Sequence, residues 1–367
     1  MFLFFPMVKK VLITGAGGPA GVNVLRSLRD CGERIEVYGT DISNYHCEYA
    51  KPWVTKIFLV PRCTDAVNYI SAINDIIAKW KIEFVHPQPD IEVAVLSENR
   101  EKINAMTYLP AKETIQICQD KQKSADIWQK KGFPTAKAIP LRPSHLDADV
   151  ERAFNELGKK IWVRATKGAG GTGSTPAENA DTVIHWIKYW LSRGHNWNFI
   201  AQEFLPGRNI AISSIFKDGE CVTSQGRERL EYIYPYLAPS GVTGTPAVAR
   251  TINDDNINKL ATEAVLAIDP SATGVFSVDM KENKAGVVIP TEINAGRFFT
   301  TSYYFSMAAK RFNVWYANMP YLLVKLAYKE KIPDIKRYNI LPPNVYWIRH
   351  IDCGEHLVTE DELTCVS

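Results

Sequence analysis

The sequence has 367 residues, of which 46% are hydrophobic and 23% are charged. These values are typical of a soluble globular protein with room for two or three domains. The formal net charge of +3 is too small to indicate binding to nucleic acid or to a membrane surface. The sequence contains no run of about 18 apolar residues, so it predicts no transmembrane helix.

The seven cysteines are scattered along the chain and include no Cys-x-x-Cys pair. An odd number without metal-ligand spacing predicts neither a disulfide framework nor a zinc site, and it indicates a reducing compartment. The opening MFLFFPMVKK places its lysines after the apolar run, which is the reverse of the order in a secretory signal. We therefore expect a cytoplasmic protein.

The first third of the chain alternates strands with helices. We expect helices at 20–31 and 65–80, the second with one apolar stripe, and strands at 9–14, 35–40, 56–60 and 82–86. Strands and helices that alternate through short connections predict a doubly wound parallel sheet, and hence an α/β fold.

The turn after the first strand invites a dinucleotide hypothesis. Gly15-x-Gly17-x-x-Ala20 fits a loosened nucleotide-binding fingerprint, and Asp41 ends the second strand where an NAD-binding acid would lie. The same turn also arises wherever a strand must enter a helix tightly. An NAD-dependent oxidoreductase is therefore kept as an alternative, although it leaves residues 120–300 unexplained.

The rest of the chain mixes helices with strands in hairpin spacing. We expect helices at 119–132, 146–157, 182–192, 254–268, 301–311 and 319–330, and strands at 160–164, 197–204, 210–217, 220–224, 275–280, 287–293 and 345–351. Strands joined by short turns favour an antiparallel sheet, and hence α+β architecture in the C-terminal part.

The hairpin at 275–294 carries the strongest chemical signal. Counting outward from a turn centred between Ala285 and Gly286 places Asp279 opposite Glu292, and Asn294 shares the face of Glu292 because it lies two residues along the strand. Carboxylate and amide oxygens that converge in this way suit Mg²⁺ or Mn²⁺ bound to phosphates. A surface hairpin with a solvated polar face is the alternative.

Two further stretches are typical of nucleotide contacts. A glycine-rich loop follows the strand that ends in Arg164, and its backbone N–H groups can approach an anion closely; its glycines are Gly168, Gly170, Gly171 and Gly173. The segment 202–205, QEFL, is similar to a hinge that pairs with the adenine edge. A flexible hairpin and an ordinary core strand are the respective alternatives.

The order of these motifs resembles the ATP-grasp superfamily, and in particular the ATP-grasp halves of the carbamoyl phosphate synthase large subunit and carboxylate–amine ligases. The motifs are Asp120-Lys121, the cation at 164, the glycine loop, Gln-Glu-Phe-Leu-x-Gly at 202–207, Val-Asp-x-Lys at 278–281 and Glu-Ile-Asn at 292–294. The resemblance covers residues 8–351. It implies a Rossmann-like pre-ATP-grasp domain at 1–118, a lid subdomain at 119–204, a C-terminal subdomain with the metal site at 205–353, and a polar tail at 354–367.

The resemblance also implies a role for each matched residue. Arg164 and Arg297 would act on the transferring phosphoryl group, and the metal ligands would be Asp279, Glu292 and Asn294. The ATP-binding set would comprise Lys121, Arg164, Gly168, Gly170, Gly171, Thr172, Gly173, Gln202, Glu203, Phe204, Leu205 and Asn209. Asn209 departs from the family's usual acid at the ribose, and the extra residue before Arg297 departs from the commoner Glu-x-Asn-x-Arg spacing.

The activity implied is an ADP-forming ligase that uses ATP and Mg²⁺ (or Mn²⁺). A small carboxylate is activated as an acyl phosphate, which an amine then attacks, inside a site that excludes water. Candidates for the acceptor pocket are Gly18, Pro19, Gln88, Arg227 and Arg229, each with a solvated surface residue as the alternative. The expected partners are small molecules, without nucleic acid or membrane; a homodimer and a non-catalytic ATP-binding module stay open.

Overall fold

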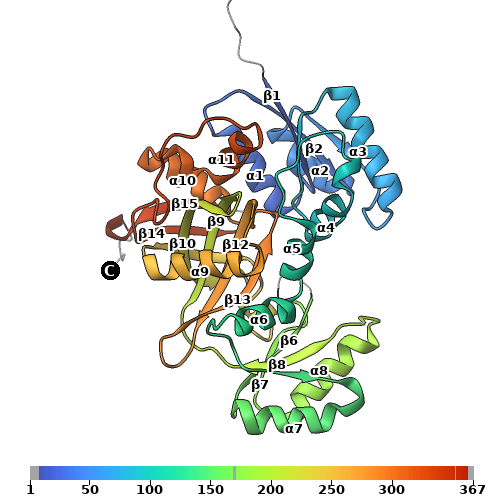
Figure 1. Ribbon diagram of the computed structural model, residues 1–367, viewed down its shortest axis with the longest axis vertical. Helices are drawn as coiled ribbons and strands as arrows, with labels where there is room; N and C mark the ends of the chain where they lie inside the picture. The colour runs from blue at the N-terminus through green and yellow to red at the C-terminus, as the bar shows by residue number, and fades with distance from the viewer. Residues whose placement is uncertain (1–7, 168–170, 352, 363–367) are drawn as a thin grey trace, which may run out of the picture.

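The computed structural model describes residues 8–167, 171–351 and 353–362, and it contains three β-sheets. The N-terminal sheet lies at the top of Figure 1, a seven-stranded sheet occupies the middle, and a small sheet lies at the bottom. The predicted combination of a parallel sheet followed by antiparallel sheets is confirmed.

The N-terminal sheet is parallel, with strand order β3-β2-β1-β4. Its central strand is an apolar run, Val11 to Ile13, which is buried on both faces as a parallel sheet requires. The strands are β1 (Lys9–Thr14), β2 (Ile35–Asp41), β3 (Lys56–Leu59) and β4 (Phe84–His86), and the helices are α1 (Pro19–Arg29), α2 (Asn44–Ala50), α3 (Ala66–Trp80) and α4 (Asp90–Glu98).

Other parts of the protein occupy the space beside the glycine turn that follows β1. A Cβ at Gly17 would lie 1.9 Å from the backbone oxygen of His46 in α2, and Gly17 donates its N–H to Asp41 at 3.0 Å. Asp41 also accepts from the backbone N–H groups of Ile42 and Ser43. The turn therefore serves close packing and a carboxylate cap, and it leaves Asp41 already bonded where an NAD ribose would need it.

The seven-stranded sheet has the order β13-β12-β9-β10-β11-β14-β15. Its strands are β9 (Asn209–Lys217), β10 (Glu220–Tyr232), β11 (Pro246–Ile252), β12 (Gly274–Glu282), β13 (Val288–Ala295), β14 (Val345–His350) and β15 (Gly354–Thr359). The expected strand at 220–224 runs on to Tyr232, and β11 was not expected. The greater length of β10 matters for the site, because β10 carries Arg227 and Arg229.

The two faces of this sheet have different partners. Even-numbered residues of β9 and β12, such as Ile212 and Val278, pack under α9 (Asp255–Ile268). Odd-numbered residues point the other way because side chains alternate along a strand. On that face Ile215 and Val275 join a core that β1, α1, α10 (Tyr303–Phe312) and α11 (Met319–Ala327) share. The polar end of the same face is left for the site.

The small sheet has the order β5-β8-β6-β7 and forms, with α7 and α8, a unit that we call the small subdomain. Its elements are β5 (Ala138–Leu141), α7 (Leu146–Leu157), β6 (Ile161–Ala165), β7 (Thr175–Ala177), α8 (Ala180–Ser192) and β8 (Phe199–Glu203). Its core is built from residues 139–201 alone.

The expected boundary at 119 needs correcting. α5 (Lys112–Cys118) leads into α6 (Lys121–Lys130), which packs against α9 and β13 of the large sheet. Trp128 of α6 is fully buried there and donates its indole N–H to the carbonyl of Ala264 at 2.9 Å. An amphipathic helix follows the apolar surface available to it, so α6 belongs with the large sheet although it precedes the small one.

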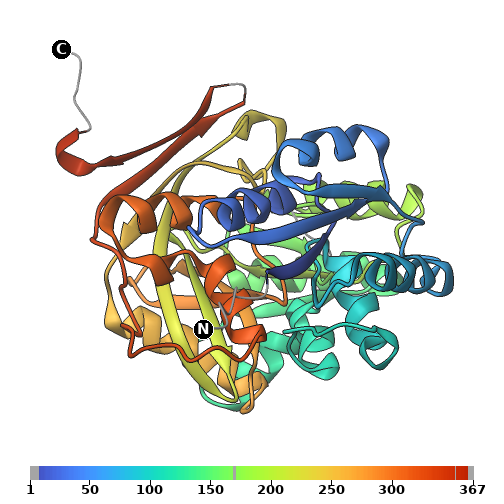
Figure 2. The ribbon, with the colours of Figure 1, turned by 90° about the horizontal axis from the view of Figure 1, so that it is seen from above.

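The expected polar tail at 354–367 also needs correcting. Residues 354–359 form β15, which pairs with β14 along its whole length and is followed by a 3-10 turn at 360–362. Leu357 joins the main core, and Gly354 adopts a φ of 71° at the turn. The two strands form a hairpin that extends from the body at the upper left of Figure 2.

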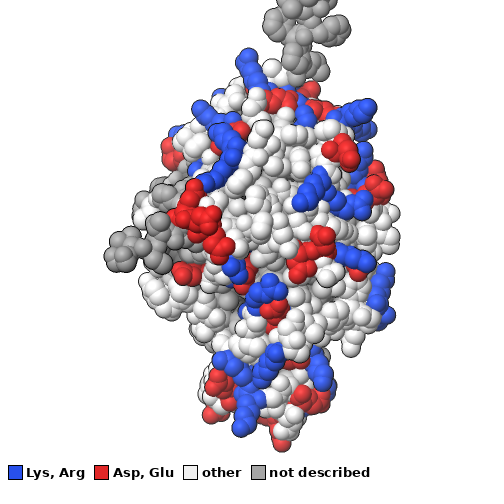
Figure 3. Space-filling view, turned by 90° about the vertical axis from the view of Figure 1, so that its left-hand side faces the viewer, with Lys and Arg blue, Asp and Glu red and all other residues white. Residues whose placement is uncertain are grey.

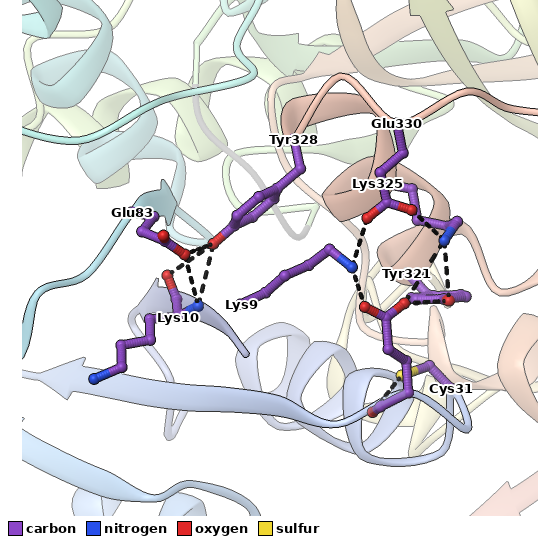
Figure 4. A network of polar contacts seen from close by, with 9 residues as sticks. Lys9, Lys10, Cys31, Glu83, Tyr321, Lys325, Tyr328 and Glu330 are labelled. Atoms are coloured by element: carbon purple, nitrogen blue, oxygen red, sulfur yellow. Dashed lines mark hydrogen bonds and ion pairs between the residues drawn. The ribbon is translucent and has the colours of Figure 1, made fainter. Parts of the chain in front are cut away.

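A network of ion pairs joins the N-terminal domain to α11 (Figure 4). Lys9 of β1 contacts Glu33 and lies 2.5 Å from Glu330, and Lys325 bridges the same two carboxylates. Tyr321 donates its hydroxyl to Glu33 at 2.6 Å. Together with the shared core, these contacts bind the N-terminal domain and the large sheet into one body.

No helix among the described residues is long and apolar enough to span a membrane. On the face in Figure 3, lysines and arginines are interspersed with aspartates and glutamates, and the small subdomain projects at the bottom of the view. A mixed surface of this kind offers no broad single-sign field for a polyanion on that face.

Candidate functional site

The β12–β13 hairpin pairs Asp279 with Glu292, as counting from the turn predicted. The centre of the turn differs from the prediction. The pairs nearest the turn, Lys281 with Ile289 and Glu282 with Val288, are centred on Ala285 and not between Ala285 and Gly286. A register shift between Asp279 and Met280 adds the extra residue Thr291 and brings Glu292 opposite Asp279. Such a bulge adds one side chain to one strand. Here the added Thr291 donates its hydroxyl to the carbonyl of Asp279 at 3.0 Å.

Each of the two carboxylates is met by cations from a different part of the chain. Arg229 of β10 lies 2.6 Å from Asp279 Oδ1. Arg164 of β6, in the small subdomain, lies 2.5 Å from Glu292 Oε2, and Lys121 at the start of α6 lies 3.6 Å from the same oxygen. The site is therefore assembled from both sheets and from α6.

The surroundings shift the pKa values of the two acids in opposite directions. Burial works to raise the pKa of Glu292, but Lys121 and Arg164 outweigh it and hold the pKa at about 2. The pKa of Asp279 is raised by burial and by the neighbouring charge of Glu292, against the opposing pull of Arg229. Burial lowers the pKa of Lys121. Glu292 is thus a fixed negative charge between two cations.

The donor set fits a divalent ion of the Mg²⁺ class. Asp279 and Glu292 face each other across one strand pair, and Asn294 lies two residues from Glu292 on the same face. Hard cations with oxygen ligands prefer such sets, and Mg²⁺ completes its shell with water and phosphate oxygens. Asn294 Oδ1 accepts from Arg297 at 2.7 Å, which fixes the orientation of the amide. We expect Asp279, Glu292 and Asn294 to hold the ion.

A pocket between the small subdomain and the large sheet contains most of the expected ATP-binding residues. Those that line it are Lys121, Arg164, Gly171, Thr172, Gln202, Glu203, Phe204, Leu205 and Asn209, together with Asp279 and Glu292. Gly173, with a φ of 75°, lies beside this wall against Trp197. Gly168 and Gly170 fall outside the described residues.

The lining residues outside the predicted set include Trp162, Tyr232, Lys281 and Thr291. Trp162 and Lys281 carry a usable signal, because each lies two residues from a predicted site residue on the same strand and so shares its face. Tyr232 was hidden by the underestimated length of β10, and Thr291 by the bulge. The apolar walls from Trp162, Phe204 and Leu205 suit a flat aromatic base.

Asn209 stands where the ATP-grasp pattern usually has an acid, and two hydrogen bonds hold its side chain in place. Its amide donates to the hydroxyl of Tyr232 at 2.7 Å, and its Oδ1 accepts from Arg229 at 3.2 Å. An acid at this position would add a second carboxylate beside Arg229. The amide instead gives a neutral polar contact, which suits a ribose hydroxyl.

A second pocket adjoins the first and shares Gly171, Arg229, Tyr232, Val242, Asp279 and Glu292 with it. Its other walls are Gln88 to Asp90 at the end of β4, Arg227, Asn294, Arg297 and the segment 243–246. Three of the five acceptor candidates, Gln88, Arg227 and Arg229, meet here. The two carboxylates thus lie on the border between the pockets.

The structure does not bring Gly18 and Pro19 into this second pocket. Pro19 lines a neighbouring pocket with Ile233 and Leu237, which shares Thr243 and Thr245 with the second pocket. Gly18 precedes α1 and is not among the residues that line the second pocket. The close contacts of the first turn with Pro89 and α2 are made by Gly15 and Gly17, whereas Pro19 is exposed. A substrate contact at Gly18 or Pro19 therefore stays a prediction.

Arg297 links the N-terminal domain to the β12–β13 hairpin. It forms an ion pair with Asp90 at the start of α4 and donates to Asn294. The extra residue in Glu-Ile-Asn-Ala-Gly-Arg is accommodated by Gly296, whose φ of 82° turns the chain. Arg297 consequently reaches the second pocket despite the altered spacing.

No family model matches the sequence. Biotin carboxylase 1 of Bacillus subtilis (strain 168) is 26% identical over 189 residues, which are 50% of this chain and 40% of that protein. The match therefore spans less than half the length of this curated relative.

Solved structures share the fold over almost the whole chain. The biotin carboxylase domain dimer of Hydrogenobacter thermophilus 2-oxoglutarate carboxylase, in complex with MgADP, ADP and bicarbonate, aligns with a TM-score of 0.67 at 14% identity, over 92% of this chain and 73% of that one. Carboxyaminoimidazole ribonucleotide synthase of Aspergillus clavatus with ATP gives 0.67 at 16%, over 93% and 81%. The L-amino acid ligase of Bacillus licheniformis gives 0.65 at 14%, over 92% and 78%.

Proposed function

We propose that this chain, which has the ATP-grasp fold, is an ATP- and Mg²⁺-dependent ligase that activates a small carboxylate and joins it to an amine, releasing ADP. The observation that carries the proposal is the position of Asp279 and Glu292. They lie on the border of two adjoining pockets, with cations from two sheets around them. Phosphoryl transfer between two bound molecules requires charge neutralisation and alignment at such a border.

The first pocket is proposed to bind ATP. Phe204, Leu205 and Trp162 would hold the base, Asn209 the ribose, and Lys121 and Arg164 the phosphates. A magnesium ion on Asp279, Glu292 and Asn294 would neutralise the phosphate oxygens. Because Arg164 and Lys121 already contact Glu292, phosphates that enter would take over these cations and release Glu292 for the metal.

The second pocket is proposed to bind the acid. Arg297 is oriented by Asp90 and Asn294, so its guanidinium lies beside the metal ligands, where a transferring phosphoryl group would pass. The small subdomain covers the first pocket with β6, β8 and Gly171, which keeps water from the reacting groups. None of these steps needs a covalent enzyme intermediate.

The relatives support this reaction class without extending their own activities to the chain. Their names describe carboxylases, a synthase and an L-amino acid ligase, and two of the structures hold ATP or MgADP. The substrates are small molecules in this proposal. One related structure is described as a domain dimer, and we extend the proposal to a homodimer in the cytoplasm.

The test is ADP release by the purified protein with ATP, MgCl₂ and a panel of amino acids and small carboxylates, with ammonium or a primary amine added in turn. We expect release that needs both Mg²⁺ and an acid. ADP release that no acid stimulates would leave a non-catalytic or hydrolytic ATP-binding module. NADH binding with indifference to ATP would favour the oxidoreductase alternative.

A further inference from the structure

Arg227 is a buried arginine in the wall of the second pocket. Its side chain is 2% exposed, and its guanidinium carbon lies 3.5 Å from the centre of the Phe299 ring. Nη1 donates to the hydroxyl of Thr301 at 2.7 Å, whereas Nε has no hydrogen-bond partner among the described residues. The aromatic ring and the hydroxyl hold the guanidinium plane in one orientation.

The other arginines of this wall have their own partners. Arg229 is paired with Asp279, and Arg297 with Asp90. Arg349, which lines a neighbouring pocket, donates to the backbone carbonyls of Pro246 and Thr300. Within the described chain, no carboxylate forms an ion pair with Arg227. Burial and the nearby charge of Arg229 lower the pKa of Arg227. A buried cation without a counter-ion is costly, so this position favours an anion brought by a ligand.

Gln88 is the second unpartnered polar group in the same pocket. It follows β4 in the N-terminal domain, is 2% exposed, and neither its Nε2 nor its Oε1 has a hydrogen-bond partner among the described residues. A primary amide both donates and accepts. A ligand carboxylate could only accept a hydrogen bond from Nε2 of Gln88. The oxygen Oε1 of Gln88 therefore requires an N–H or O–H donor on the ligand.

The register of the sheet relates Arg227 to the proposed metal site. Arg227 and Asp279 both pair with Ala211, so the two lie in one row across the sheet, on the same face and two strands apart. Two strand spacings separate their Cα atoms by about 10 Å. Because Ala211 between them has a small side chain, the long side chain of Arg227 can reach across it. An anion bound to Arg227 can then lie next to groups held by Asp279.

We propose that the acid substrate is an amino or hydroxy acid, with its carboxylate on Arg227 and its N–H or O–H group on the amide of Gln88. The proposal rests on the ligase function and deepens it by naming the substrate class. Plain monocarboxylic acids offer the carboxylate but leave Oε1 of Gln88 with no donor in the bound state. A buried polar group left unpaired in this way is what allows a site to reject an analogue that lacks one hydroxyl or amino group.

The test measures which acids are activated. Hydroxylamine replaces the amine and traps each acyl phosphate as a hydroxamate, so the readout needs no knowledge of the natural amine. The probes are matched sets that differ in one group: propionate, lactate and alanine; succinate, malate and aspartate; and bicarbonate, followed by ADP release. We expect kcat/KM for the best amino or hydroxy acid to exceed that of its plain counterpart by about 10-fold or more.

Two variants separate recognition from folding. Arg227→Gln should raise the KM for the acid by about 10-fold or more while the KM for ATP stays within about 3-fold, and Arg227→Lys should recover part of the loss. Gln88→Leu should reduce the preference over the plain acid to below about 3-fold. Arg152→Gln on the exposed side of α7 and Gln116→Leu on α5 are the matched controls and should change neither value.

The outcomes distinguish failure of this inference from failure of the proposed ligase function. Acid-dependent ADP release with equal use of plain and hydroxylated acids, or with bicarbonate as the best acid, would overturn the inference and leave the ligase intact. The same holds if Arg227→Gln lowers thermal stability but leaves the KM for the acid unchanged, because the arginine is then structural. ADP release that no acid in the panel stimulates would overturn both.

Discussion

The N-terminal domain and the small subdomain differ in how they contact the large sheet, the first through a shared apolar core and the second through polar contacts. The N-terminal domain shares one apolar core with it, from Val11 in β1 to Leu357 in β15, and the ion-pair network around Glu33 reinforces the junction. The small subdomain has a separate core. Its polar contacts with the rest of the protein include Arg164 with Glu292 and the backbone bond from Lys121 to Thr166.

This difference shows where the protein can respond to a ligand. A junction built on a shared core resists separation, because opening it would expose apolar surface. A junction that passes through the ion pair between Arg164 and Glu292 would rearrange if phosphates bound Arg164 and a metal bound Glu292, as proposed. We therefore expect ATP to act on the small subdomain and to leave the N-terminal domain in place.

The largest effect is expected at the β12–β13 hairpin. Glu292→Ala removes the fixed charge between Lys121 and Arg164, and we expect kcat to fall by about 100-fold or more. The measurement is Mg²⁺-dependent ADP release, with circular dichroism to show that the fold is intact. The matched control is Glu263→Ala on the exposed side of α9, which should keep full activity. Equal activity in both variants would remove Glu292 from the site.

The next effect tests the ionic contact of the small subdomain. Arg164→Gln keeps a polar side chain but loses the charge, so we expect kcat/KM for ATP to fall by about 10- to 100-fold. Hydrogen exchange should also become faster in β6 and in β8, which pairs with it, because the contact of Arg164 in β6 with Glu292 in β13 is lost. Arg142→Gln serves as the control, since its ion pair with Asp149 lies within the small subdomain. Unchanged exchange in Arg164→Gln would mean that other contacts hold the subdomain.

The junction of the N-terminal domain should respond in stability rather than activity. Glu33→Gln removes the carboxylate that Lys9 and Lys325 share, and we expect about 1 kcal/mol less stability in urea unfolding near pH 7, with kcat unchanged. A large loss of activity with little loss of stability would contradict the division between the two junctions.

The pH dependence of this effect follows from the sign of the pKa shift. Burial works to raise the pKa of Glu33, but Lys9 and Tyr321 outweigh it and lower the pKa below its ordinary value. A carboxylate with a depressed folded-state pKa contributes its stability above the unfolded-state pKa and loses it as the pH falls through the folded-state value. The difference between wild type and Glu33→Gln should therefore be full near pH 6 and shrink below about pH 4. A difference that grows on acidification would contradict the assignment.

The smallest effect is expected at a residue that the sequence did not indicate. Tyr232→Phe removes the hydroxyl that holds Asn209, and we expect the KM for ATP to rise by about 2- to 5-fold with kcat nearly unchanged. Steady-state kinetics at saturating acid measures it. A fall in kcat without a change in KM would place Tyr232 with the reacting groups instead.

The sequence predicted the parallel and antiparallel sheets and the pairing of Asp279 with Glu292, because alternation and turn residues are local signals. It could not show that Arg229 pairs with Asp279, because that contact depends on a strand, β10, that is longer than its apolar pattern. It assigned α6 to the wrong sheet for a similar reason, since the partner of an apolar stripe is chosen in three dimensions. The glycines at 15 and 17 matched a nucleotide fingerprint, yet α2 and Pro89 fill their space.

The most direct test of the account is hydrogen exchange of the wild type and Glu292→Ala, with and without MgATP. In the wild type we expect nucleotide to slow exchange in β6, β8 and β13 together, to leave β1 and β2 unchanged, and to have no such effect in the variant. Protection that centres on residues 15–21 and 41, or that survives in Glu292→Ala, would contradict the claim that ATP binds where the small subdomain meets the β12–β13 hairpin.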